Sequence, residues 1–246
     1  MYGLSDPQLE LQVADRFSFR IFLGTTEVIP DYSTVWLFRE RLKENGMLES
    51  IWEEFVNQLR AKGYEVKKGV IQDATFITSD PGHAKSDVPR GREAKTRRSK
   101  DGAWAKKGNK SYFGYKGHIK TDVENNFIWE VETTVANTHD SKVDLANEGE
   151  VRYGDKGYHG AKTKGYDASM KRAARGHPLS IFDELRNKRI SSKRSPVERC
   201  FSVIKIVFKS GHVMVTTVER AAVKMTFNAI GYNLFNLLGI VSRKTA

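Results

Sequence analysis

Apolar side chains recur at helical spacing in the first quarter of the chain. The clearest stripe has apolar residues three and four positions apart, on one face of a helix: Leu48, Ile51, Trp52, Phe55, Val56 and Leu59. Ser5-Asp6-Pro7 is a helix start signal. Asp31 or Ser33 can cap a later helix, and Gly63 ends the last one. These patterns predict a small all-helical N-terminal domain over residues 1–64.

The pattern then changes from helical spacing to short runs of β-forming residues. Residues 70–77 are rich in β-branched and apolar side chains and are bounded by glycine and proline, which predicts a buried strand. Two further runs, 112–121 and 127–135, are joined by the turn-forming residues 122–126. This arrangement predicts a β-hairpin.

The second half of the chain mixes one more strand with helices. Residues 143–148 predict a short helical stretch, and 150–155 predict a strand. Ser195-Pro196 predicts the start of one helix, and the capping box at 216–219 predicts the start of a long final helix. Strands followed by helices favour an α/β domain over residues 65–246, with a mixed sheet flanked by helices.

Charge narrows the function classes. The 246 residues hold 41 Lys and Arg against 30 Asp and Glu, a formal net charge of +11, which attracts polyanions such as nucleic acids or an anionic membrane surface. No run approaches the roughly 20 apolar residues of a membrane span, and the first residues lack a secretory signal. We therefore expect a soluble intracellular protein. The single cysteine, Cys200, excludes an internal disulfide and a multi-thiol zinc site.

Much of the positive charge lies in one segment, residues 84–110, with ten Lys or Arg against three acids. A segment so charged and rich in glycine cannot build a core, so we expect a basic mobile loop. We favour an arm that contacts DNA phosphates, with a solvated surface loop as the alternative. The proposed contacts are Arg92, Arg97, Arg98, Lys106 and Lys107.

Three carboxylates are the candidates for chemistry. Asp73 lies inside the first predicted strand, where an ionised carboxylate is costly unless it is paired or binds a metal. Asp155 ends a predicted strand, at the edge where α/β folds place their sites. Glu198 falls in the first turn of the helix opened by Pro196, with Lys205 on the same face. Each carboxylate also has a purely structural explanation. Asp73 could accept backbone hydrogen bonds, Asp155 could end its strand as a turn residue, and Glu198 could interact favourably with a helix dipole.

Read together, the segments around these carboxylates resemble the three acidic blocks of insertion-sequence transposases of the DDE class. The segments are Asp73-Ala-Thr-Phe, Tyr153-Gly-Asp155-Lys-Gly-Tyr-His, and Arg194-x3-Glu198-x6-Lys205. The last block is specific, because it fixes Arg, Glu and Lys at set intervals. Tyr112 to His118 resembles the family's second-strand signature, and Ala136 to Ser141 the stretch after its third strand.

The resemblance covers essentially residues 1–240, because the helical front portion is also similar to the front domain of these enzymes. Two departures stand out. Family members commonly have a tyrosine three residues before the arginine of the last block, whereas this chain has Ser191. Related proteins also usually carry additional upstream helical sequence, so we expect a truncated copy or an alternative start.

The resemblance implies a ribonuclease-H-like fold in which Asp73, Asp155 and Glu198 hold two Mg²⁺ or Mn²⁺ ions. Oxygen-only ligands suit these ions, and such a pair catalyses phosphodiester cleavage and strand transfer. Arg194 and Lys205 are suited to bind DNA phosphates. We also consider that His139 either supports the metal ligands by a hydrogen bond or contacts DNA. A zinc site is not expected, because the histidines are distant in sequence and lack cysteine partners.

The expected activity is therefore that of a DDE-type DNA transposase that cleaves and joins DNA at insertion-sequence ends. Its partners are double-stranded DNA, as transposon ends and target, and a second copy in a homodimer, because two ends must be joined. The family implies a cytoplasmic, nucleoid-associated protein of a prokaryotic cell, with no membrane partner. Two alternatives remain: a metal-dependent nuclease without strand transfer, and a non-catalytic DNA-binding derivative.

Overall fold

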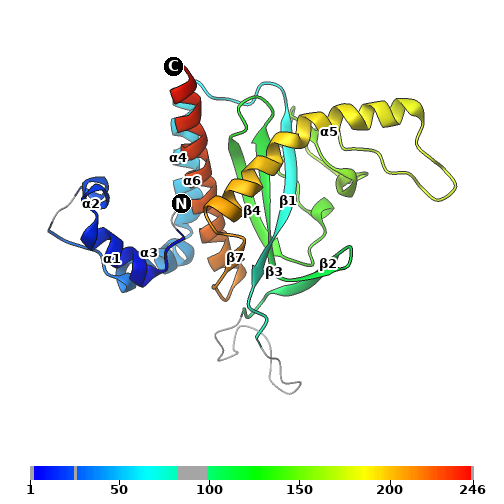
Figure 1. The fold of residues 1–246 in the computed structure, drawn as a ribbon. Helices are drawn as coiled ribbons and strands as arrows, with labels where there is room; N and C mark the ends of the chain where they lie inside the picture. Colours follow the sequence, from blue (N-terminus) through cyan, green and yellow to red (C-terminus); the bar gives the residue numbers. More distant parts are fainter. Residues whose placement is uncertain (1–2, 25–26, 83–98, 245–246) are drawn as a thin grey trace.

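The computed structural model describes residues 3–24, 27–82 and 99–244. Arg92, Arg97 and Arg98 lie outside these ranges. A central sheet forms the middle of the molecule (Figure 1). Its strands are β1 (Val70–Ser79), β2 (Ala103–Lys107), β3 (Lys110–Asp122), β4 (Ile128–Val135), β5 (Val151–Tyr153), β6 (Tyr166–Asp167) and β7 (His212–Val213).

The sheet is mixed, as the sequence predicts. β1 pairs antiparallel with β3 along nine residues, and β3 pairs antiparallel with β4 to form the predicted hairpin. On its other side β1 pairs in parallel with β5, which is followed by β6, while β7 pairs in parallel with the end of β1. The predicted buried strand is β1, and it lies at the centre of the sheet.

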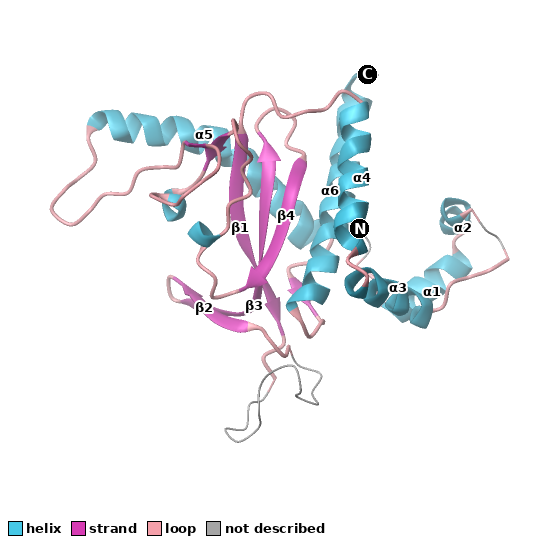
Figure 2. Cartoon of the chain, turned by 180° about the vertical axis from the view of Figure 1, so that it is seen from behind, coloured by secondary structure: helices cyan, strands magenta, loops and turns pink. Residues whose placement is uncertain are grey.

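Helices occupy both ends of the chain. They are α1 (Asp6–Asp15), α2 (Phe17–Leu23), α3 (Tyr32–Glu44), α4 (Met47–Ala61), α5 (Ile181–Ser202) and α6 (Val218–Lys244). Ser5 caps α1 and Asp31 caps α3, which confirms the predicted starts of both helices. α4 and α6 run beside each other next to β4 (Figure 2). Trp52 and Val56 of α4 belong to the same buried cluster as the sheet, and a domain division at residue 64 stays a prediction.

The two faces of the sheet differ in chemistry. Ile71 of β1 and Ile119 of β3 face α5 and α6 and form part of the apolar core. The opposite face carries buried cations, each paired with carboxylates from the segment between β4 and α5. The pairs are Lys116 with Asp140, Lys120 with Glu150, and Arg152 with Asp144 and Asp167. Ion pairs therefore hold the segment between β4 and α5 against this face, since an unpaired buried cation would be costly.

The prediction that a helix begins at Ser195-Pro196 is wrong. α5 begins at Ile181, where the Ser180 side chain accepts a hydrogen bond from the Asp183 amide, and Pro196 lies inside the helix. A proline here removes the amide that would bond to the Ser192 carbonyl. The Ser195 hydroxyl donates to that carbonyl instead, at 3.1 Å. The helix therefore continues through the proline, and Glu198 lies in its last turns.

The sequence also misassigned three shorter features. Residues 143–148 form no helix, and a 3₁₀ turn at Asp140–Lys142 precedes them. The predicted basic loop is partly a strand. β2 pairs with β3, and Trp104 packs on Phe113 with the ring centres 5.3 Å apart and the ring planes tilted. The cap of α6 is Thr217 rather than Thr216, because the Thr217 hydroxyl accepts from the Arg220 amide. Among the described helices, none is long and apolar enough to cross a membrane.

Candidate active site

Asp73 lies in the middle of β1, on the face covered by α5. Its Oδ1 accepts a hydrogen bond from the Ala74 amide at 2.8 Å, and its Oδ2 accepts from Nη2 of Arg194 at 2.9 Å. Burial raises the pKa of Asp73 to about 6 despite these two stabilising partners. Its side chain keeps 20% of its surface exposed, so the carboxylate can be reached from solvent.

Asp155 reaches the same region through the sheet register. β5 pairs Tyr153 with Ile71 in parallel and ends there, so Asp155 follows β5 on the edge of β1 that carries Asp73 two residues after Ile71. The negative charge of Asp155 contributes to the raised pKa of Asp73. Asp155 caps a 3₁₀ turn, Lys156–Tyr158, by accepting from the Gly157 amide at 2.8 Å. Its other carboxylate oxygen has no hydrogen bond within residues 3–24, 27–82 and 99–244.

A third aspartate, Asp140, belongs to this region and was missed as a site residue by sequence reasoning. Its charge also raises the pKa of Asp73, after that of Asp155. Lys116 donates to Asp140 Oδ1 at 2.8 Å and to the Thr138 carbonyl at 2.7 Å. Asp140 follows β4 by five residues, and its place after a strand, like that of Asp155, is the signal that could have identified it.

His139, next to Asp140, has a local structural role. It caps the 3₁₀ turn at Asp140–Lys142, and its Nδ1 accepts from the Ser141 amide at 3.2 Å. The same nitrogen is 2.7 Å from the Ser141 hydroxyl. These contacts orient the ring toward its own turn, and a role for His139 behind the metal ligands or against DNA stays a prediction.

The structure brings Asp73, Asp155 and Arg194 together but does not bring Glu198 to them. Glu198 lies one helical turn after Arg194, on the same face of α5, and its side chain is exposed. In the described part of the chain, no group of three or more His, Cys, Asp or Glu residues is placed to hold a metal ion. The longer Arg194 side chain reaches Asp73 and neutralises it. The assignment of Glu198 as a ligand stays a prediction.

Two predicted phosphate-binding lysines converge from different elements. Lys205 lies in the π-helical turn Val203–Val207 that follows α5, and Lys107 ends β2. Burial lowers the pKa of Lys205, and the positive charge of Lys107 lowers it further. Like charges held this close create a local positive potential, which suits a phosphate.

The comparisons with known proteins identify the family of this chain. Residues 65–234 match the family described as Transposase DDE domain, and residues 1–41 match a Transposase domain (DUF772). The first match spans more than half of the chain, so the protein belongs to the DDE transposases, whose catalytic domain has a ribonuclease-H-like fold.

A named relative adds to this assignment. The transposase for insertion sequence element IS1106 from Neisseria meningitidis serogroup B is 26% identical over 217 residues, which cover 80% of this chain and 75% of the relative. No solved structure shows significant similarity to the chain. Membership of a transposase family implies a DNA substrate, and DDE transposase domains generally use divalent metal ions.

Proposed function

We propose that this protein cleaves DNA at insertion-sequence ends and joins the freed strand to a target, in a reaction that depends on divalent metal ions. The observation that carries the proposal is the Asp73 carboxylate, which is partly buried in β1, near enough to Asp155 for its charge to act on it, and still accessible to solvent. Burial of an acid beside two further acids is costly for a purely structural site. A cation-binding role accounts for that cost.

The donor set fits Mg²⁺ or Mn²⁺. All candidate ligands are carboxylate oxygens, which these hard cations prefer, and the charges of Asp155 and Asp140 already bear on Asp73. Asp73, Asp155 and Glu198 would hold two ions. When bound, the ions activate the attacking hydroxyl group and stabilise the leaving oxygen.

Arg194 and Glu198 share one face of α5, and we propose that they exchange roles when DNA binds. In the state described here Arg194 supplies the positive charge that Asp73 requires. Cations held at Asp73 would leave Arg194 free to bind a DNA phosphate, for which its planar guanidinium is suited. Glu198, one turn further along, would then turn toward Asp73.

The DNA-binding surface follows from the same geometry. Lys107 and Lys205 hold one phosphate between them. Lys106 precedes Lys107 in β2 and points to the other face of the strand, where it would contact a different phosphate. The segment containing Arg92, Arg97 and Arg98 would extend this surface. We further propose that two copies act together, because two transposon ends must be joined.

The test measures cleavage and joining of a duplex that carries the ends of the element, with Mg²⁺ or Mn²⁺. Asp73→Asn, Asp155→Asn and Glu198→Gln should each abolish both steps while leaving DNA binding intact. Glu184→Gln is the matched control, since Glu184 is an exposed acid in the first turn of the same helix. Full activity of Glu198→Gln would contradict its assignment. Cleavage without joining would favour a nuclease, and DNA binding without cleavage by the native chain would favour a non-catalytic derivative.

A further inference from the structure

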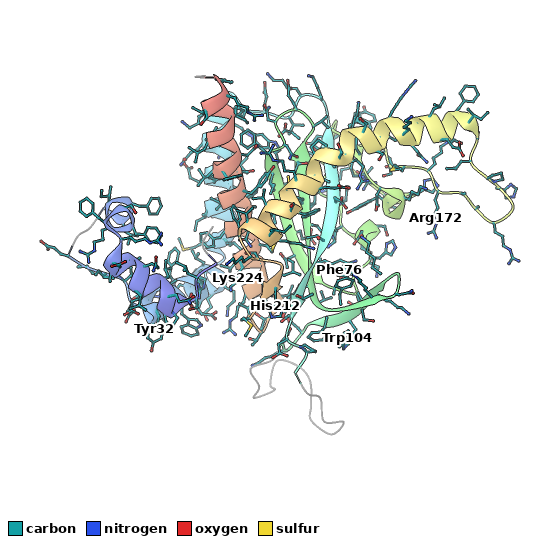
Figure 3. The ribbon with its side chains drawn as sticks, viewed as in Figure 1. Tyr32, Phe76, Trp104, Arg172, His212 and Lys224 are labelled. Atoms are coloured by element: carbon teal, nitrogen blue, oxygen red, sulfur yellow. The ribbon has the colours of Figure 1, made fainter. Side chains whose placement is uncertain are left out.

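A cavity lies where the N-terminal helices meet the rest of the protein. It shares no residue with the aspartate site, the region around Asp73 and Asp155. Its volume is about 550 Å³, and its walls come from the start of α1, from α3, from β7 and from α6. This volume is within the range of about 300 to 1,000 Å³ that is usual for small-molecule sites. Figure 3 labels two of its wall residues, Lys224 of α6 and His212 of β7.

The walls of this cavity are strongly basic. Among the residues that line it, the cations are Arg39, Lys209, Arg220 and Lys224, and the single acid is Asp6. Asp6 is paired with Arg39. Arg220 is paired with Glu40 of α3. Among these four cations, Lys209 and Lys224 are therefore the two that are not paired with a carboxylate.

Within residues 3–24, 27–82 and 99–244, the side chains of Lys209 and Lys224 make no hydrogen bond or ion pair. Burial lowers the pKa of Lys224, and the nearby Arg39 lowers it further, against a smaller opposite effect of Asp6. A half-buried cation without a counter-charge raises the free energy of the folded protein unless an anion binds there.

The backbone holds Lys209 at this position at some cost. Its φ of +54° is in the left-handed region that favours glycine, and its aliphatic stem lies directly against Gly3. Backbone strain of this kind is concentrated at binding and catalytic sites. Lys209 thus lies in the cavity wall beside Gly3, with its residue exposed to solvent.

The cavity also offers an aromatic surface. Trp36 of α3 lines it and keeps 47% of its surface exposed. Exposed aromatic rings beside lysines are the usual elements of sites for single-stranded nucleic acids, in which bases stack on the ring and phosphates contact the cations. A base in a duplex is already stacked on its neighbours, so this arrangement favours an unpaired nucleotide.

We propose that this cavity binds one unpaired nucleotide of single-stranded DNA, with the phosphate between Lys209 and Lys224 and the base against Trp36. The proposal rests on the proposed function in one respect, that the ligand is DNA. It gives the enzyme a contact for a strand freed by cleavage, away from Asp73.

The test uses a labelled 15-nucleotide oligothymidylate and the full chain, with EDTA present so that no metal chemistry contributes. Replacing both Lys209 and Lys224 by Gln should reduce the salt dependence of log affinity by about 0.7, the value for one neutralised phosphate of a single strand. Trp36→Ala should weaken binding on the order of tenfold, and Trp36→Phe should retain most of it. Lys62→Gln, at the exposed end of α4 and outside the cavity, is the control for a lost positive charge.

Two further measurements separate this role from a structural one. Lys224→Gln should leave the thermal stability of the free protein unchanged or raised, while it weakens oligonucleotide binding. Oligothymidylate should quench tryptophan fluorescence in the native chain and much less in Trp36→Phe, and a blunt duplex should not. Lower stability of Lys224→Gln, or equal quenching by inorganic phosphate or by the duplex, would overturn the proposal.

Failure here is distinguishable from failure of the proposed function. The oligonucleotide measurements are repeated with Lys107 and Lys205 both changed to Gln, which removes the phosphate contacts proposed for the aspartate site but keeps every residue of the cavity. Equal binding by the native protein and this double variant supports a separate site, whatever the outcome of the cleavage assays. Loss of oligonucleotide binding in the double variant would assign that binding to the surface beside the aspartates and contradict the proposal.

Discussion

Glu40 joins α3 to α6, and its removal should make the protein less stable at neutral pH but not in acid. Arg220 donates to it from Nε at 2.6 Å and from Nη2 at 2.9 Å, and Lys43 donates at 2.7 Å. Hydrogen bonding from Arg220, the largest effect, lowers the pKa of Glu40 from 4.5 to about 2, against the opposing effect of burial. At about 1.36 kcal/mol per pKa unit, the full shift corresponds to about 3.4 kcal/mol. Solvent reaches Arg220, which is 31% exposed, so we expect about 1 to 2 kcal/mol.

The pH dependence gives the sign of this effect. A carboxyl group with a depressed pKa stabilises the folded state above its unfolded pKa of 4.5, and this contribution is lost as the pH falls toward 2. Urea unfolding should therefore show Glu40→Gln less stable than the native chain at pH 7, with the two curves converging below about pH 3. Glu44→Gln is the control, because Glu44 is exposed and its nearest ammonium nitrogen, on Lys43, is 3.9 Å away. Parallel curves for native and Glu40→Gln proteins from pH 7 to 2.5 would refute the reasoning.

Two further predictions concern metal and DNA. Mg²⁺ or Mn²⁺ should raise the thermal unfolding temperature of the native chain and do so much less in Asp155→Asn, because a ligand that binds only the folded state stabilises it; an equal response in both proteins would count against Asp155 as a ligand. Replacing Lys107 and Lys205 together by Gln should lower the salt slope of duplex affinity by about 0.9, the value for one shared phosphate. An unchanged slope, measured by fluorescence anisotropy from low to moderate salt, would leave the two lysines without a role in DNA binding.

The aspartates were predictable from the sequence because local patterns determine their positions. A run of β-branched residues around Asp73 and a strand ending near Asp155 indicate two strands, and β1 and β5 pair in parallel within the mixed sheet. The start of α5 was not predictable in this way. Ser195-Pro196 has the local features of a helix start, but the helix continues because the Ser195 hydroxyl satisfies the carbonyl that the proline leaves free.

The hairpin of β2 and β3 is local: Trp104 packs on Phe113 across the ladder, although the charge pattern of β2 is typical of a loop. Contacts between distant residues explain the other differences. Asp140 binds a lysine of β3, 24 positions away, and the pairing of Arg194 with Asp73 joins residues 121 positions apart. Patterns within a window of ten to twenty residues contain neither of these two contacts.

β1 has a mechanical consequence for the enzyme. It is hydrogen-bonded to β3 along most of its length and to β5 and β7 on its other edge, so its backbone is restrained from both sides. Any movement of Asp73 would have to displace several strands at once. If Asp73 is catalytic, as proposed above, adjustment to different DNA ends would fall to α5 and to the segments around the sheet, whereas Asp73 itself would stay in one place. Such a division would let the regions that recognise DNA diverge in sequence without loss of the geometry at Asp73.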